Sequence, residues 1–300
     1  MTCRLCRDLD RRTFVGLLGA GLAAMLGGCG ASARPTTGTL GTGRGRPGPR
    51  PAGVSRTGPT TTVAPTTTTG PPPLPPIPSP VPGPATVFSQ GPPQARAANQ
   101  VAITIDDGFC QECAAGYAQF AQQSGIHITF NPNGTYNQIW APLAPTLGPL
   151  IEAGQVQIGN HTYSHPDMTN LSDTGVQAEL EKNEEWIQST FGITSRPWWR
   201  PPYGYHNYRT DAAAGQVGFT NVLMWNGSYG DSGLLTPQVL LADAQQYLQA
   251  GVVMLGHANY PTILGLFGQI QELIAERNLT TVTVDEMFGT SRQSGQAVTT

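Results

Sequence analysis

Positive charge is scarce in the C-terminal two thirds of this sequence. Residues 99–300 hold five Arg and one Lys against 17 Asp and Glu, which gives this segment a formal charge of −11. A protein that binds nucleic acid through its phosphate groups needs a surface rich in Lys and Arg, and six scattered cations do not supply one. The composition therefore argues against nucleic acid as a partner and favours neutral or cationic substrates.

Acidic residues are absent from residues 31–98. The same stretch has six Arg and 17 of the 27 Pro residues of the chain. A segment of this composition cannot bury enough apolar surface to fold. We expect a disordered Pro/Thr/Gly-rich linker over residues 30–98, followed by one globular domain over residues 99–300, which is long enough for a sizeable core.

A long hydrophobic run is also missing at the N-terminus. The apolar run over residues 15–26 is shorter than the roughly 20 residues of a membrane-spanning helix and is typical of a signal peptide. Arg11 and Arg12, followed by Phe14, resemble a twin-arginine export signal. The segment LGGC that ends at Cys29 resembles a bacterial lipobox, in which the cysteine is lipidated after cleavage. We expect a signal peptide over residues 1–29 and an extracytoplasmic lipoprotein anchored to the cell membrane, or a secreted protein if Cys29 is incidental.

Only five cysteines occur in the chain. Cys3 and Cys6 belong to the segment that a signal peptidase removes, and Cys29 is assigned to the lipid. Cys110 and Cys113 therefore remain for the domain. Outside the cytosol two nearby cysteines favour a disulfide over a short loop. A labile redox pair and free thiols beside a metal are the alternatives.

From residue 100 onward, short apolar runs alternate with longer amphipathic stretches, a pattern that predicts an α/β fold. In such a fold, functional groups gather where parallel strands end at their carboxyl side. We expect strands near residues 100–105, 126–130, 155–158, 197–199, 219–224, 252–255 and 281–284. We expect helices near residues 112–124, 143–153, 172–190, 237–249 and 262–276.

Two of the expected strands are followed by side chains suited to binding a metal. Asp106 and Asp107 end the first strand, and His161 and His165 follow the third. Two neutral imidazoles and one carboxylate give three protein ligands and leave positions for water and substrate, as in a catalytic zinc site. Each motif by itself also fits a structural role, as a turn with satisfied carboxylates or as capping or core histidines.

Two further expected strands end near a cationic group. Arg200 begins the turn RPPYG after the fourth strand, and His257 ends the sixth. Separately, they fit a surface arginine and a core histidine as well as they fit a functional site.

Together and in this order, these segments resemble the motifs of the polysaccharide deacetylase family, also described as NodB-homology domains or carbohydrate esterase family 4. The matching segments are Thr104–Gly108, His161–His165, Arg200–Gly204 and Leu255–His257. The resemblance implies an α/β fold, namely a distorted and incomplete (β/α) barrel of the NodB-homology type. It also implies an enzyme that removes acetyl groups from N-acetylated sugars. The substrate it suggests is an extracytoplasmic polysaccharide, first of all the GlcNAc or MurNAc units of peptidoglycan, with chitin oligosaccharides and acetylxylan as alternatives.

The resemblance also implies roles for the metal ligands and the base. Asp107, His161 and His165 would hold a divalent cation, Zn²⁺ in the first place, with Co²⁺ or another divalent ion as alternatives. Asp106 would act as the general base, held ionised and oriented by Arg200.

The remaining roles concern the acid and the acetyl pocket. His257 would protonate the departing amine, with Asp231 at the spacing of the carboxylate that orients it. The backbone N–H of Tyr203 would bind the oxyanion, and Trp225 and Leu255 would contact the acetyl group. Two positions depart from the fourth motif of the family, where serines replace an acid and an aromatic residue: Ser228 and Ser232. A non-catalytic lipoprotein of the same fold that binds cell-wall glycan is therefore the alternative from another functional class.

Overall fold

The computed structural model describes residues 79–290. The expected signal peptide, the lipobox with Cys29 and most of the expected linker lie outside the described residues. Among residues 79–290, no helix is long and apolar enough to cross a membrane.

A six-stranded parallel sheet forms the centre of the domain. Five strands follow the order β4-β3-β2-β8-β7, and β9 pairs with the beginning of β2. The long strand β2 is buried along nearly its whole length, which agrees with its continuous apolar run. The strands are β2 (Gln100–Asp107), β3 (Ile128–Pro132), β4 (Val156–Ile158), β7 (Gly227–Ser228), β8 (Val253–His257) and β9 (Thr280–Val282).

A second sheet consists of three parallel strands. Its order is β1-β6-β5, with β1 (Thr86–Phe88), β6 (Asn221–Leu223) and β5 (Trp198–Trp199). A single bridge between Asn160 and Trp199 links the end of β4 to β5. In the described residues the strands therefore form no closed barrel, which confirms the expected α/β fold with an incomplete barrel.

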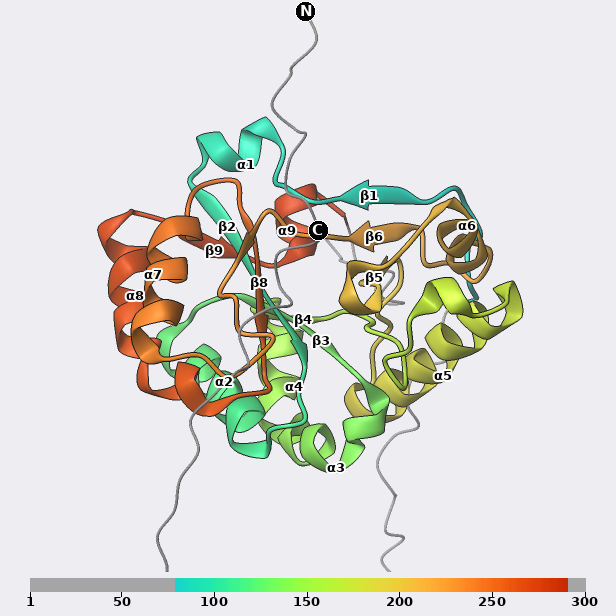
Figure 1. The fold of residues 1–300 in the computed structure, drawn as a ribbon, viewed down its shortest axis with the longest axis horizontal. Coiled ribbons are helices and arrows are strands. Elements are labelled where there is room, and N and C mark those ends of the chain that lie inside the picture. The colour runs from blue at the N-terminus through green and yellow to red at the C-terminus, as the bar shows by residue number, and fades with distance from the viewer. Residues whose placement is uncertain (1–78, 291–300) are drawn as a thin grey trace, which may run out of the picture. The chain divides into compact units, whose positions relative to one another are not determined.

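The helices lie around the outside of the strands (Figure 1). They are α1 (Pro93–Ala97), α2 (Gln111–Ser124), α3 (Asn137–Trp140), α4 (Ala144–Glu152), α5 (Asp173–Phe191), α6 (Tyr208–Gln216), α7 (Pro237–Tyr247), α8 (Phe267–Glu276) and α9 (Val284–Phe288). Helix α5 shows why the boundaries fall where they do. Ser172 caps its first turn by accepting a hydrogen bond from the Gly175 N–H, and Gly192 ends it in a left-handed conformation.

The main hydrophobic core lies between the six-stranded sheet and the helices that cover it. Strands β2 and β3 contribute Ile103, Ile105 and Phe130, and Trp140 of α3 is completely buried. This packing fixes the carboxyl ends of β2, β3, β4 and β8 relative to one another, so side chains that follow these strands have defined positions.

The expected boundary between linker and domain is wrong. Strand β1 and helix α1 lie inside residues 30–98, and Val87 of β1 pairs with Val222 of β6. The folded part therefore includes β1, which begins at Thr86. A strand in a Pro-rich segment is possible here because β1 lies at the edge of its sheet and is paired on one side only.

Four further elements were not expected from the pattern: the nine-residue helix α6, and the shorter α3, α9 and β7. The helix expected over residues 262–276 is a 3-10 helix over Pro261–Gly265 followed by α8. Elements of two to five residues carry too few periodic positions to be recognised in a sequence.

Candidate active site

Strand β2 ends in a tight turn that presents two carboxylates. Asp106 and Asp107 are 2% and 9% exposed, and φ is +64° at Asp107 and +107° at Gly108. A Cβ atom at Gly108 would lie 2.3 Å from Nε1 of Trp140, so only glycine fits there. The carboxylates of both residues line the same pocket, and they lie 3.7 and 3.4 Å from Nε2 of His161.

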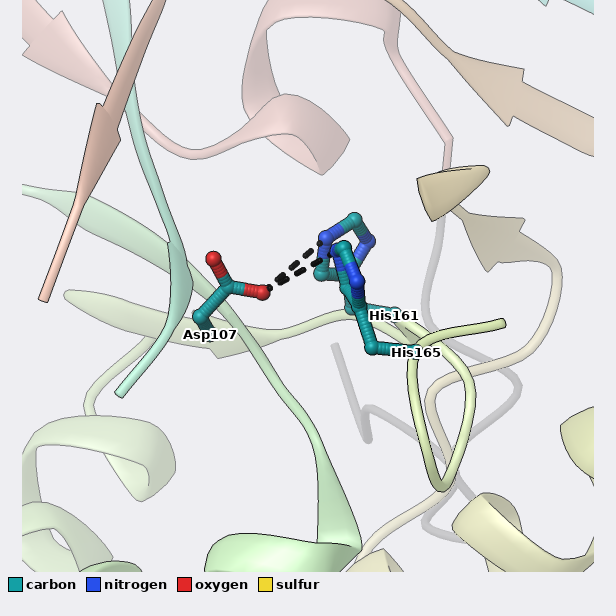
Figure 2. Close-up of side chains that lie close together, drawn as sticks. All are labelled: Asp107, His161 and His165. Carbon is teal, nitrogen blue, oxygen red and sulfur yellow. Dashed lines mark ion pairs between the residues drawn. The ribbon is translucent and has the colours of Figure 1, made fainter. Parts of the chain in front are cut away.

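Asp107 and the two predicted histidines come together at the end of the sheet (Figure 2). Oδ1 of Asp107 lies 3.4 Å from Nε2 of His161 and 3.3 Å from Nε2 of His165. One ligand atom from each residue lies within 4.8 Å of the other two. His161 and His165 lie in a loop, not on a helix, and φ is positive at Thr162 and His165. The donor set of two imidazoles and one carboxylate fits a divalent cation of the zinc type.

Hydrogen bonds and neighbouring charges act differently on the two histidines. The backbone carbonyl of Arg200 lies 2.8 Å from Nδ1 of His161 and can only accept, so Nδ1 donates, and in the neutral imidazole the lone pair is on Nε2, the nitrogen near Asp107. Burial and the neighbouring His161 lower the pKa of His165 to about 4. Burial lowers the pKa of His161, but Asp106 and Asp107 outweigh it and raise the pKa above its usual value. The negative charges of Asp106 and Asp107, which attract a proton to His161, would also attract a metal cation.

Three buried side chains that the sequence analysis did not single out support this centre. Asn259 donates to Oδ2 of Asp107 at 2.7 Å and accepts from the N–H of Gly108, while Trp140 donates to the Asp107 carbonyl. Asn133 donates to the backbone carbonyls of His161 and Thr162 at 2.6 and 3.0 Å. The only signal for Asn259 and Asn133 was their position just after β8 and β3, at the edge where the other site residues were expected.

Asp106 has one oxygen occupied and one directed to the metal ligands. Its Oδ1 accepts hydrogen bonds from Nη1 of Arg200 at 2.7 Å and from Nδ2 of Asn131 at 2.9 Å. Its Oδ2 lies 3.7 Å from Nε2 of His161. Arg200 is completely buried and also donates to Thr104 and to the Leu223 carbonyl, so its position is fixed. The arrangement leaves Oδ2 available to take a proton next to a bound cation.

His257 ends β8 on the other side of Asp106, and Asp231 holds it. Oδ1 of Asp231 lies 2.9 Å from Nδ1 of His257, and Oδ2 accepts the backbone N–H of the same residue at 3.1 Å. Burial lowers the pKa of His257, but the hydrogen bond and the charge of Asp231 outweigh it, so the pKa is raised above its usual value. The imidazolium form is therefore favoured more than in a free histidine, as suits a proton donor.

A pocket of about 540 Å³ joins these groups, within the range of roughly 300–1,000 Å³ that is usual for ligand sites. The predicted residues that line it are Asp106, Asp107, His161, His165, Tyr203, Trp225, Leu255 and His257. Arg200 and Asp231 lie behind this lining, in contact with Asp106 and His257. Ser228 and Ser232 line the pocket too. The Tyr203 side chain is 60% exposed, and its ring lies 4.5 Å from the His165 ring.

Backbone conformations with positive φ concentrate at this pocket. Six residues other than glycine have positive φ between residues 79 and 290, and four of them belong to the site: Asp107, Thr162, His165 and Tyr203. Such conformations cost about 1–3 kcal/mol each and persist where the surrounding structure fixes them. Next to this site, Cys110 and Cys113 form a disulfide at the beginning of α2.

The sequence is similar to those of known proteins. The sequence profile of the family described as polysaccharide deacetylase matches residues 94–222. The peptidoglycan-N-acetylglucosamine deacetylase PgdA of Listeria monocytogenes is 24% identical over 218 residues, which cover 71% of this chain and 44% of PgdA. The chain spans about half the length of PgdA and of two further curated relatives.

Solved structures show the same fold. The Bc1960 peptidoglycan N-acetylglucosamine deacetylase superposes with a TM-score of 0.60 at 22% identity, over 69% of this chain and 95% of Bc1960. BA3943 of Bacillus anthracis, described as a pseudoenzyme of carbohydrate esterase family 4, superposes with a TM-score of 0.59 at 20% identity, over 69% and 70% of the two chains.

Proposed function

The chain belongs to the polysaccharide deacetylase family over residues 94–222, and on that premise we propose that it is a metal-dependent hydrolase that removes N-acetyl groups from amino sugars of an extracytoplasmic polysaccharide. The substrate we propose is peptidoglycan, at its GlcNAc or MurNAc units. One observation carries the proposal: a single pocket unites the Asp107, His161 and His165 set with a second carboxylate, Asp106, and with His257, which is hydrogen-bonded to Asp231.

Asp107, His161 and His165 would hold the cation, with Zn²⁺ first and Co²⁺ or another divalent ion as alternatives. The chemistry that such an ion supplies is Lewis acidity toward an amide carbonyl and toward water. Asn259 keeps Oδ2 of Asp107 occupied, so Oδ1 is the oxygen that faces the histidines. Partners of this kind orient metal ligands and tune their affinity.

Asp106 would act as the general base through Oδ2. As the oxygen of water attacks the acetamide carbon, the proton of that water moves to Oδ2, the oxygen that no hydrogen bond to Arg200 or Asn131 occupies. The Arg200 charge beside Oδ1 favours the ionised carboxylate, which is the form that accepts the proton.

His257 would act as the general acid. When the carbon–nitrogen bond breaks, the imidazolium gives its proton from Nε2 to the departing nitrogen, which leaves as a neutral amine, and the other product is acetic acid. The acid then gives its proton to the amine, so acetate and a protonated amino sugar are released, and transfer of the proton held by Asp106 to His257 restores both groups. Asp231 binds Nδ1 and therefore directs the opposite nitrogen, Nε2, away from the carboxylate. Orientation and proton affinity of this group both depend on Asp231.

The acetyl group would lie between the metal ligands and an apolar wall. Trp225 and Leu255 line the pocket on this side, and the backbone N–H of Tyr203 would hydrogen-bond to the oxyanion that develops at the carbonyl. The positive φ of 59° at Tyr203 sets the direction of its peptide group.

Peptidoglycan is the first choice of substrate because PgdA and Bc1960 are both named as peptidoglycan N-acetylglucosamine deacetylases. Chitin oligosaccharides remain an alternative for the same amide hydrolysis, since a chitin deacetylase of Amylomyces rouxii is 42% identical over 69 residues. Acetylxylan, whose acetyl groups are esters, remains the other alternative, since a bifunctional xylanase/xylan deacetylase of Cellvibrio japonicus is 28% identical over 196 residues. The location we propose follows from the N-terminal sequence. A signal peptide over residues 1–29 and a lipid on Cys29 would place the enzyme at the outer face of the membrane, and loss of membrane association in Cys29→Ala would support this.

A non-catalytic glycan-binding protein is the second candidate, because BA3943 shares the fold and Ser228 and Ser232 depart from the family motif. The pocket argues for turnover instead. Base, acid and three metal ligands are all present by type, and their contacts match their proposed roles.

The test is acetate release by purified residues 30–300 from peptidoglycan, chitin oligosaccharides and acetylxylan. The protein is first stripped of metal by a chelator and then measured with and without added Zn²⁺, beside Asp106→Asn. We expect zinc-dependent release, fastest from peptidoglycan, and nearly none from Asp106→Asn. A metal-loaded, folded protein that binds glycan without releasing acetate would establish the binding function instead.

A further inference from the structure

A group of aromatic side chains beside the pocket has no part in the proposed chemistry. Phe109, Tyr136 and Tyr260, here called the Phe109 cluster, follow β2, β3 and β8. Phe109 and Tyr136 line the pocket. The side chain of Phe109 is 44% exposed although it is entirely apolar. An apolar ring left in water at the entrance of a polar pocket is a surface to which a ligand can bind.

The Phe109 ring is held in place from several directions. Its centroid lies 5.6 Å from the Tyr260 ring at an interplanar angle of 87° and 6.1 Å from the Tyr136 ring at 61°. Its backbone N–H donates to Oδ1 of Asn259. The next residue, Cys110, donates to the Ala258 carbonyl and forms the disulfide with Cys113. A ring that is already fixed loses little conformational entropy when a ligand stacks on it.

A second aromatic group lies on the other sheet. Tyr203 and Tyr205 follow β5, Trp225 follows β6, and together they are called the Tyr203 cluster. The rings of Tyr203 and Tyr205 lie 5.7 Å apart and are 60% and 53% exposed. Because Tyr203 and Trp225 line the pocket together with Phe109 and Tyr136, the pocket lies between aromatic side chains from both sheets.

This arrangement fits a polymer better than a single sugar. The proposed metal ligands, base and acid line the same pocket as Phe109 and Tyr203, so a reacting sugar unit in this pocket has aromatic rings beside it. The C–H groups on one face of a pyranose ring form an apolar surface that packs on an aromatic ring. The Phe109 cluster is therefore in place to receive a unit next to the reacting one.

We propose that Phe109 binds the pyranose ring adjacent to the sugar that is deacetylated, so that its aromatic face determines how strongly the rate increases with the length of the glycan chain. This inference rests on the proposed function and specifies the substrate of the same site. Tyr136 and Tyr260 act as positioning residues for Phe109, since they contact its ring.

The experiment compares Phe109→Leu with the native protein on N-acetylglucosamine oligomers of one to six units. Leucine keeps apolar contact with Tyr136 and Tyr260 but has no aromatic face. We expect the ratio of kcat/KM on the hexamer to kcat/KM on the monomer to fall about three- to tenfold in Phe109→Leu, as the energy of an aromatic contact predicts. The matched control, Phe109→Tyr, keeps the aromatic face, and we expect it to retain most of the native ratio.

Zinc content is measured in each variant, because Phe109 is only two residues from Asp107. A ratio that stays native in Phe109→Leu would overturn the inference, and so would an equal loss on all chain lengths. If the native protein releases no acetate from any oligomer, the proposed function fails, and calorimetric affinity for the same oligomers decides the inference. An affinity that rises with chain length in the native protein and less in Phe109→Leu supports it, and equal dependence on length in both proteins refutes it.

Discussion

The two sides of the pocket differ in their backbone conformation. On the metal side, which consists of Asp107, His161 and His165, two of the three residues have positive φ. On the acid side, which consists of His257 and Asp231, His257 is the last residue of the regular strand β8. Several hydrogen bonds from different elements fix the metal side, among them those of Asn133 and Asn259. One carboxylate, Asp231, holds the acid side. Removing a single support should therefore weaken metal binding only in part, while removing Asp231 should change the proton affinity of the acid directly.

The largest effect should follow from His257→Ala, which removes the proton donor. We expect kcat to fall about 10²- to 10⁴-fold, the usual contribution of general acid catalysis, while zinc content stays at the native level because His257 is not a ligand. Steady-state acetate release and metal analysis measure both. His127→Ala is the matched control, since His127 pairs with Glu286 away from the pocket. Loss of zinc in His257→Ala would show that His257 also contributes to metal binding, and it would contradict the separate roles of the metal side and the acid side.

Asn259→Ala should weaken the metal side without destroying it. The carboxylate of Asp107 loses the donor to Oδ2, and we expect zinc affinity to fall about 10- to 100-fold. Competition with a chromophoric chelator measures the affinity. Asn170→Ala removes a comparable Asn–Asp hydrogen bond on the surface and should leave zinc affinity unchanged. Equal affinity in Asn259→Ala and the native protein would refute the role of this amide.

Asp231→Asn should alter the pH dependence of the acid side. Activity requires protonated His257 and is lost as the pH rises through the pKa of this group. Asp231 raises that pKa, so its neutralisation should move the alkaline limb of the kcat/KM profile to lower pH. Asp211→Asn disrupts the similar pair with His206 elsewhere and should leave this limb in place. An unshifted limb in Asp231→Asn would mean that another group sets it.

The smallest effect should come from Ser228→Ala. In the described part of the chain, the Ser228 hydroxyl accepts a hydrogen bond from the Gly230 N–H at a partly exposed position. We expect a loss of about 0.5–1.5 kcal/mol of stability and an unchanged alkaline limb, measured by thermal unfolding and by the pH profile. A large fall in kcat/KM would instead assign the serine to substrate binding.

Sequence patterns predicted the residues that would take part in the proposed reaction better than the residues that hold them in position. The positions of Asp106, Asp107, His161 and His257 could be predicted because each lies at or just after the carboxyl end of an apolar strand. Asn131, Asn133 and Asn259 were not recognised, since a buried asparagine has no signature until its partners are known. The early start of the domain at β1 was missed because the pairing of β1 with β6 joins segments that are far apart in the sequence.

The most direct test compares the two adjacent carboxylates. Calorimetric titration of the chelator-treated protein with Zn²⁺ is combined with acetate release for Asp106→Asn and Asp107→Asn. The account predicts that Asp106→Asn binds one Zn²⁺ per chain with nearly native affinity while its activity falls about 10²- to 10⁴-fold, and that Asp107→Asn loses zinc affinity and activity together. Native zinc affinity in Asp107→Asn, or native activity in Asp106→Asn, would contradict the assignment of base and ligand.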